Sequence, residues 1–215
     1  MARDTKERIL EAALELFAQS GYLGTSMSDI AARLGITKAA LYKHYTGKQE
    51  ILDSIVTYMS EMDHQRAAEY DMPDAEPDGF AEAYLHTPID KIRAYSTAQF
   101  DHWTKEPFPA NFRKMLTLEQ FRSEEMSRLY QQYLVSGPLG YLTDLFGARN
   151  LPDAAERAAM LYGAMFLFYG VYDGAGDKKA VLELLCGHID RFISRMTGLC
   201  RYANASISRT PRAWQ

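Results

Sequence analysis

Basic residues gather in one short window of the 215-residue chain, where their chemistry suits a polyanion. Between Asp29 and Glu50 the sequence contains no acidic residue, and it carries the potential donors Arg33, Lys38, Lys43, His44 and Lys48. A window of positive charge free of carboxylates is what binding to a phosphate backbone requires. The alternative is a solvated basic surface on an ordinary helical corner. The spacing of the residues around the charges favours nucleic-acid binding.

Helix signals surround this window and would position its side chains. Ser26 followed by Asp29 is a capping-box pattern, and the next residues place apolar side chains on one face of a short helix. Gly35 allows a sharp turn, and Thr37 can cap a second short helix over residues 38–45. Thr46 with Gln49 predicts the cap of a third helix, whose free N–H groups and Lys48 could hold a phosphate. The segment from residue 25 to 48 therefore predicts a helix-turn-helix.

The first ~50 residues resemble the DNA-binding domain of the tetracycline-repressor (TetR) family of transcriptional regulators. The resemblance rests on a first-helix pattern, on the turn glycine and on the run from residue 37 to 45, namely Ile9, Ala12, Phe17, Gly21, Thr25, Ile30, Ala31, Gly35, TKAALYKHY and Lys48. It implies groove contacts from Thr37, Lys38 and Ala39, and phosphate contacts from Tyr42, His44 and Lys48. Ser26 and Lys43 complete the predicted DNA-binding set. Ala39 stands where the family commonly has glycine and Tyr45 where it commonly has phenylalanine, so the base readout does not carry over.

Charge is distributed unevenly along the chain. The whole sequence has a net charge of −4 and is 47% hydrophobic, as expected of a soluble globular protein. Residues 1–48 contain seven Lys/Arg against five Asp/Glu, whereas the remainder contains 17 against 23. The basic character is thus local to the predicted DNA-binding part.

Targeting, membrane and metal signals are weak throughout. The two cysteines, Cys186 and Cys200, have no metal-ligand spacing, and the N-terminus has no signal-peptide pattern. The longest apolar run, residues 158–172, is shorter than the ~20 residues that a membrane span needs. We expect a cytoplasmic protein with no cofactor, no metal site and no membrane partner.

Helical periodicity without strand-like alternation predicts an all-α fold in three parts. These are a helix-turn-helix domain over residues 1–48, a helical regulatory and dimerisation domain over 49–200, and a flexible tail over 201–215. The first helix should begin at a cap formed by Asp4 and Glu7. After a helix that spans 48–69 and belongs to both domains, a surface loop over 70–80 is expected. The further helices expected cover residues 87–105, 110–122, 124–146 with a break at Gly137-Pro138, 153–172 and 177–196.

The last two predicted helices should form an antiparallel hairpin. The first arm carries small residues at Ala155, Ala159, Gly163 and Gly170, which would allow close approach of another helix pair. One alternative is that both arms simply complete the core of a single chain. The family resemblance implies instead a four-helix bundle with a second copy, and hence a homodimer that binds a palindromic operator.

Aromatic residues and methionine are dense between residues 80 and 172, which suggests a small-molecule cavity between helices. Ordinary core packing is the alternative for each of them. The resemblance makes this part the inducer domain, and an aromatic or a cationic ligand would be compatible with its residues. The side chains predicted to face the ligand are Gln99, His102, Trp103, Glu119, Arg122, Tyr141, Tyr162 and Phe166.

Catalytic patterns are missing from the sequence. The five histidines are scattered, and Cys186 and His188 would lie about 200° apart on a helix, so they cannot serve one metal. We therefore expect a ligand-responsive transcriptional regulator, most simply a repressor that a small molecule releases from its operator. A regulator that activates is an alternative within the family, and a helical small-molecule binding protein without specific DNA binding is the alternative outside it.

Overall fold

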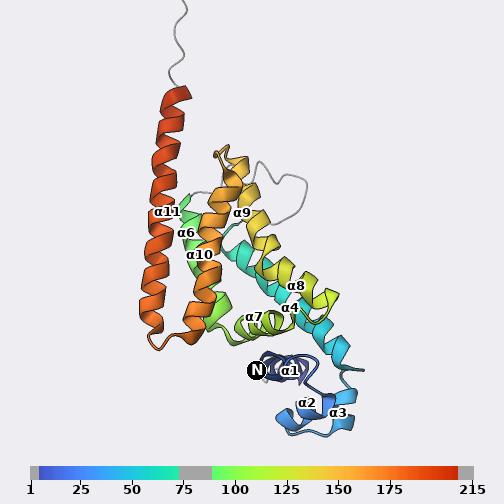
Figure 1. The fold of residues 1–215 in the computed structure, drawn as a ribbon. Coiled ribbons are helices and arrows are strands. Elements are labelled where there is room, and N and C mark those ends of the chain that lie inside the picture. The colour runs from blue at the N-terminus through green and yellow to red at the C-terminus, as the bar shows by residue number, and fades with distance from the viewer. Residues whose placement is uncertain (1–4, 73–88, 208–215) are drawn as a thin grey trace, which may run out of the picture.

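The structure is a computed structural model that describes residues 5–72 and 89–207, with side chains for residues 5–72 and 91–196. Within these ranges every regular element is a helix, so the predicted all-α fold is confirmed. Figure 1 shows a small head at one end, formed by the first helices, and a larger helical body. The helices are α1 (Thr5–Ser20), α2 (Met27–Leu34), α3 (Lys38–Tyr42), α4 (Lys48–Glu69), α6 (Ile89–Lys105), α7 (Pro107–Glu119), α8 (Glu124–Leu134), α9 (Ser136–Ala148), α10 (Ala154–Gly174) and α11 (Lys178–Ile207).

The head forms around one face of α1. Ile9, Ala13 and Phe17 recur at helical spacing on that face and are fully buried. Ile30 of α2 and Leu41 of α3 complete the same core with no exposed surface. Because α2 and α3 are too short to be stable alone, this shared core is what holds the helix-turn-helix together.

The predicted caps of α2 and α3 are confirmed. Ser26 and Asp29 form a capping box, in which the Asp29 N–H donates to the Ser26 hydroxyl and the Asp29 carboxylate accepts from the Ser26 N–H at 2.8 Å. Gly35 ends α2 in the left-handed region at φ 68°, and the Thr37 hydroxyl accepts from the Ala40 N–H. The second helix is shorter than expected, because its last turn tightens into i→i−3 hydrogen bonds and ends at Tyr42.

Helix α4 has the predicted extent but a different cap. The backbone N–H and the hydroxyl of Thr46 both donate to the Glu50 carboxylate, at 2.6 and 2.7 Å. The predicted pairing of Thr46 with Gln49 is therefore wrong. Gln49 instead accepts from the Tyr22 hydroxyl and donates to Asp53 and Glu125, so it links α4 to its neighbours.

Two boundaries in the body differ from the sequence expectation because prolines occupy first turns. Helix α7 begins at Pro107 rather than Ala110, since a first-turn proline needs no hydrogen-bond donor. The predicted break near Gly137-Pro138 is present, but it falls at Val135, so that Pro138 lies in the first turn of α9. Gly137 is required there, because a Cβ atom would lie 1.9 Å from the Gln132 carbonyl oxygen.

The predicted hairpin of α10 and α11 is present along one side of the body (Figure 1). Asp177 caps α11 by accepting from the Ala180 N–H at 3.0 Å. Asp153 does not cap α10, because it adopts a left-handed conformation at φ 56° and its side chain makes no cap hydrogen bond. Helix α11 continues through Ile207, past its expected end at residue 196 and into the expected tail.

Several expectations fall outside the described residues. They are the Asp4 cap of α1, the first two residues of the helix expected over 87–105, most of the loop expected over 70–80, and the last eight residues of the tail. In the part of the chain that the structure describes, no helix has the length and apolar character needed to cross a bilayer.

Candidate nucleic-acid interface and internal cavity

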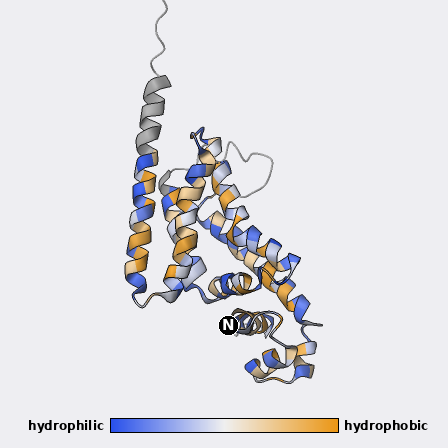
Figure 2. Cartoon of the chain, viewed as in Figure 1, coloured by the Kyte–Doolittle hydropathy of each residue, from blue (hydrophilic) through white to orange (hydrophobic). Residues whose placement is uncertain are grey.

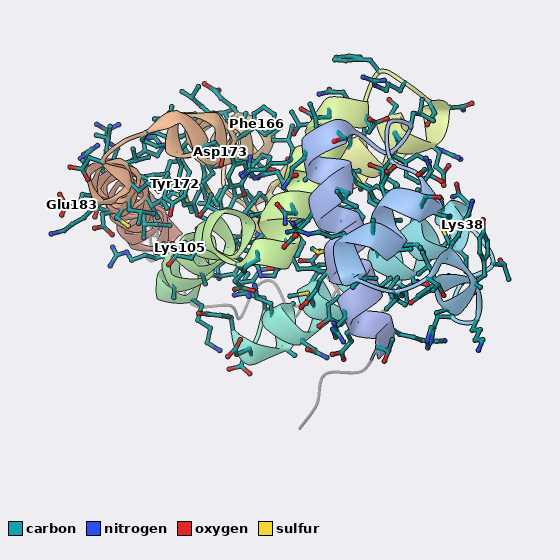
Figure 3. The ribbon with its side chains drawn as sticks, turned by 90° about the horizontal axis from the view of Figure 1, so that it is seen from below. Lys38, Lys105, Phe166, Tyr172, Asp173 and Glu183 are labelled. Atoms are coloured by element: carbon teal, nitrogen blue, oxygen red, sulfur yellow. The ribbon has the colours of Figure 1, made fainter. Side chains whose placement is uncertain are left out.

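The start of α3 presents its side chains to solvent. Thr37, Lys38 and Ala39 are exposed, as are Tyr42 and Lys43 one turn later. The Lys38 ammonium lies 5.9 Å from the centre of the Tyr42 ring, so the two side chains share one surface. Figure 3 shows Lys38 at the edge of the head, at the opposite end of the molecule from Glu183. This face of the head can therefore meet a large partner without obstruction from α10 and α11.

The basic window is only partly free of carboxylates in three dimensions. Arg33 forms an ion pair with Glu15, which reaches it from α1. No described carboxylate forms an ion pair with Lys38 or Lys43, so these two carry the free positive charge beside α3. The sequence window missed Glu15 because that residue lies 18 positions away in the chain.

Lys48 has a structural role besides the predicted phosphate contact. Its ammonium donates to the carbonyl oxygens of Tyr22 and Thr25, at 2.5 and 2.7 Å, and lies 4.4 Å from the centre of the Tyr22 ring. Burial lowers the pKa of Lys48, and the charge of Glu119 opposes that shift. An ammonium has three donors, so one remains for a phosphate.

The other two predicted contacts are partly engaged in the head itself. The Ser26 hydroxyl lies 2.6 Å from the Asp29 carboxylate, and its hydrogen bond, with that of the Ser26 N–H, lowers the pKa of Asp29. His44 is half-buried behind the end of α3. The DNA-contacting roles of all eight residues stay predictions.

A cavity of about 340 Å³ lies in the body between α4, α6, α8, α9 and α10. Four of the predicted ligand-facing residues line it: Gln99, Trp103, Tyr141 and Tyr162. The remaining lining residues are Ser60, Asp63, His64, Tyr95, Ser96, Gln132, Tyr133, Gly137, Pro138, Leu142, Met165 and Tyr169. Its size and its aromatic walls are typical of a small-molecule site.

The other four predicted ligand residues do not line this cavity. His102 is fully buried beside Arg66 and Glu106, about 100° around α6 from Trp103. Glu119 and Arg122 lie at the end of α7, under the head rather than in the body's interior. Phe166 is 40% exposed on the outer face of α10.

Sequence reasoning missed the wall that α4 contributes. Ser60, Asp63 and His64 line the cavity, and Asp63 follows the fully buried Met59 by one helical turn. The sequence does contain a pattern that indicates this wall: a carboxylate, Asp63, stands one helical turn after an apolar residue, Met59, on the same face of α4.

Asp63 is the carboxylate of this cavity. Its side chain is 28% exposed, and burial raises its pKa to about 6, against the opposing charge of Arg66. Its Oδ1 atom lies 3.8 Å from His102 Nε2, and neither atom has a hydrogen-bond partner. Arg66 is held by Glu106 at 2.6 Å, and burial lowers the pKa of His102.

Helix α7 joins the cavity region to the head, because it packs along α1 (Figure 1). At its centre the buried Arg113 donates to the Trp103 carbonyl oxygen at 3.0 Å and pairs with Asp173 of α10 at 2.9 Å. At its end Glu119, only 1% exposed, accepts from the Tyr22 N–H at 3.1 Å. Helix α7 is thus held to the cavity wall at its centre and to the connection between α1 and α2 at its end.

No group of three or more His, Cys, Asp or Glu residues that could hold a metal occurs within the described ranges. His188 lies 3.3 Å from the Met160 carbonyl oxygen through Nε2, and Cys186 is half-buried with a pKa raised by burial. A raised pKa does not favour a thiolate nucleophile.

Comparison with known proteins places these features in context. The family model for bacterial regulatory proteins of the tetR family matches residues 9–55. An uncharacterized HTH-type transcriptional regulator, TtgW of Pseudomonas putida, is 31% identical over 100 residues, which are 46% of this chain and 71% of that protein. The icaADBC biofilm operon negative regulator IcaR of Staphylococcus aureus strain Newman is 31% identical over 134 residues, 59% of this chain and 70% of the relative.

Among solved structures, the fold resembles AibR in complex with isovaleryl coenzyme A and operator DNA, with a TM-score of 0.58. That match covers 86% of this chain and 97% of AibR at 21% identity, so it supports the fold and not a shared function.

Proposed function

Because the chain belongs to the tetR family of bacterial regulatory proteins, we propose that it is a transcriptional repressor that a small molecule releases from a palindromic operator. It acts as a homodimer, in the cytoplasm and without catalytic activity. The head over residues 1–48 reads the DNA, and the body over 49–200 binds the ligand and the second copy.

The exposed start of α3 is the observation that carries the DNA-binding role. Thr37, Lys38 and Ala39 are exposed there, Lys38 lies at the edge of the head (Figure 3), and Lys38 and Lys43 pair with no described carboxylate. A short helix with its first residues exposed beside free lysines is the arrangement that enters a major groove. Lys38 would then influence which sequence is read, whereas Lys43 would hold the backbone of any sequence.

The outer face of the hairpin supports the homodimer. Figure 2 shows hydrophobic residues along α10 and α11. Several large apolar side chains on these helices are exposed, as are small residues of α10, namely Met160, Phe166, Leu167, Val171 and Leu184 with Ala159, Gly163 and Gly170. A contiguous exposed apolar face marks an interaction site. Pairing with the same face of a second copy would bury it and give the two-fold symmetry that a palindromic operator demands.

The cavity supports control by a ligand. Its walls include α4, which begins in the head at Lys48, and α6, which contacts α7 through the bond from Arg113 to the Trp103 carbonyl oxygen. For a released repressor, the ligand must bind the DNA-free state more tightly, and by reciprocity DNA must weaken ligand binding. The cavity alone would also suit the alternative, a small-molecule binding protein without specific DNA binding.

Binding to the promoter region upstream of the protein's own gene separates these two functions. We expect the wild-type protein to shift this DNA in a gel and to lose affinity steeply as salt rises. Replacing Lys38 and Lys43 together with alanine should weaken binding about 10-fold or more and reduce the salt slope by about 1–2. Lys179→Ala, at an exposed ion pair on α11, is the matched control. Unchanged affinity and slope in the double variant would show that α3 does not contact the DNA.

A further inference from the structure

The walls of the cavity combine aromatic rings with a single carboxylate. Six rings line it, belonging to Tyr95, Trp103, Tyr133, Tyr141, Tyr162 and Tyr169. The faces of such rings attract a cation, most strongly where water is excluded. The rings of this cavity can therefore enclose the apolar part of a ligand and also attract a positive charge that it carries.

The groups around the cavity compensate the charge of Asp63 only in part, through Arg66 and His64 and through His102 at 3.8 Å. Among the described lining residues there is no lysine or arginine, and the lining histidine, His64, has its Nδ1 atom 2.6 Å from the Ser60 carbonyl oxygen. Arg66 is the nearby cation, but its guanidinium is bound by Glu106. Arg113, which lies behind the Tyr169 ring at 5.1 Å, is likewise paired with Asp173. An anionic ligand would find no free positive charge here.

Hydrogen-bond acceptors in the wall lack donors. Oδ1 of Asp63 and Oε1 of Gln99 are buried without a partner, although the Gln99 amide donates to the Tyr95 hydroxyl at 3.0 Å. The exposed part of the Asp63 side chain belongs to its other atoms, because Oδ1 itself is buried. Oδ1 faces His102 Nε2 at 3.8 Å, so a ligand would meet the rest of the carboxylate, which is the exposed part. A carboxylate exposed beside an aromatic cavity calls for a ligand that brings an N–H donor and positive charge.

We propose that the effector is a lipophilic ammonium ion, whose charged nitrogen lies against the Asp63 carboxylate while its apolar body is enclosed by the aromatic rings. The proposal rests on the proposed function, since the same cavity is the effector site. Asp63 belongs to α4, so the cation would act directly on the helix that begins in the head.

A matched pair of probes tests the charge. N,N-dimethylbenzylammonium and isobutylbenzene have nearly the same shape, but only the first is positively charged and carries an N–H donor. Binding can be followed through the fluorescence of Trp103, in a Trp214→Phe background that leaves one tryptophan in the chain. At pH 7.5 we expect the cation to bind about 10-fold or more tightly than the hydrocarbon. The anion 4-phenylbutanoate should bind more weakly than either.

Two variants assign the preference to Asp63. Asp63→Asn keeps the shape of the side chain and should bring the affinities for cation and hydrocarbon to within about 3-fold of each other. Glu61→Gln removes an exposed carboxylate from the same helix and should preserve the preference. Equal binding of the two probes to the wild type, tighter binding of the anion, or a preference that survives Asp63→Asn would each overturn the proposal.

The same proteins in the DNA-binding assay separate this proposal from the proposed function. Release of the promoter DNA by the cation, but not by the hydrocarbon at equal concentration, supports both. DNA binding without any preference for the cation refutes the ligand class and leaves the repressor intact. Selective cation binding by a protein that shifts no DNA supports the ligand class and refutes the repressor.

Discussion

At the scale of single residues, Asp63 shows how a functional group can oppose stability. A carboxylate whose pKa is raised to about 6 binds a proton more tightly in the folded than in the unfolded chain. Its contribution to the free energy of unfolding is therefore most favourable at low pH and falls as the pH rises from about 4 to about 6. The ionised Asp63 carboxylate thus lines the cavity although it lowers the stability of the fold.

Asp63→Asn should consequently stabilise the ligand-free protein at pH 8, by up to about 3 kcal/mol, because the amide carries no charge to desolvate. The gain should shrink towards pH 5, where the wild-type carboxyl group is largely protonated. Urea unfolding at the two pH values measures this, with Glu61→Gln as the control. A variant less stable than the wild type at pH 8 would contradict it.

The charged or titratable groups around Asp63 are His64, Arg66, His102, Glu106, Tyr133 and Tyr169.

At the scale of the elements, α7 connects the two parts of the molecule. It packs along α1, and its terminal Glu119 holds the Tyr22 N–H at the point where α1 leads into α2. Gly21 permits this approach, because it adopts φ 78° and a Cβ atom there would lie 2.4 Å from the Glu119 carboxylate. Glu119, predicted from the sequence to touch a ligand, instead fastens the head to the body.

Glu119→Ala should leave the partly buried Tyr22 N–H without its partner and remove a charge that opposes the pKa shift of Lys48. We expect a loss of about 1–3 kcal/mol in unfolding free energy, together with weaker DNA binding. Arg122→Ala, which removes the exposed partner of Glu119, should change stability by less than about 0.5 kcal/mol. Thermal unfolding of both variants measures these changes. An equal loss of unfolding free energy in the two variants would refute the special role of Glu119.

The helices differ in how well the sequence predicted them, and the reason is the range of the interactions. The caps at Ser26 and Thr37 and the turn at Gly35 depend on residues three or four positions apart, and all were predicted. Half of the predicted ligand residues line the cavity. The contribution of Asp63 was missed, because the cavity forms only where α4 packs against helices that begin 26 or more residues after Asp63 in the chain. Helical periodicity indicates that a residue faces inward without saying what it meets there, as His102 and Trp103 illustrate.

At the scale of the whole molecule, the exposed face of the hairpin should control assembly. Gly163 lies on that face, and a Cβ atom added to it would meet nothing within 4 Å beyond its chain neighbours and the backbone of its own helix. Gly163→Glu should therefore leave the protomer folded and place a charge in the dimer interface, raising the dimer dissociation constant about 100-fold. Sedimentation velocity measures this, and Lys114→Glu on exposed α7 surface is the control. A dimer unaffected by Gly163→Glu would place the interface elsewhere.

The length of α4 has a geometric consequence for such a dimer. Its 22 residues form a rod about 33 Å long, with Lys48 at one end and Asp63 about 22 Å along it. A rotation of about 10° about the far end of the rod would displace the head by about 6 Å. Two heads moving apart symmetrically would change their spacing by about 12 Å, the width of a major groove, against the ~34 Å that separates adjacent half-sites. A small tilt of α4 at the cavity is thus enough to move one head off its half-site while the other remains bound.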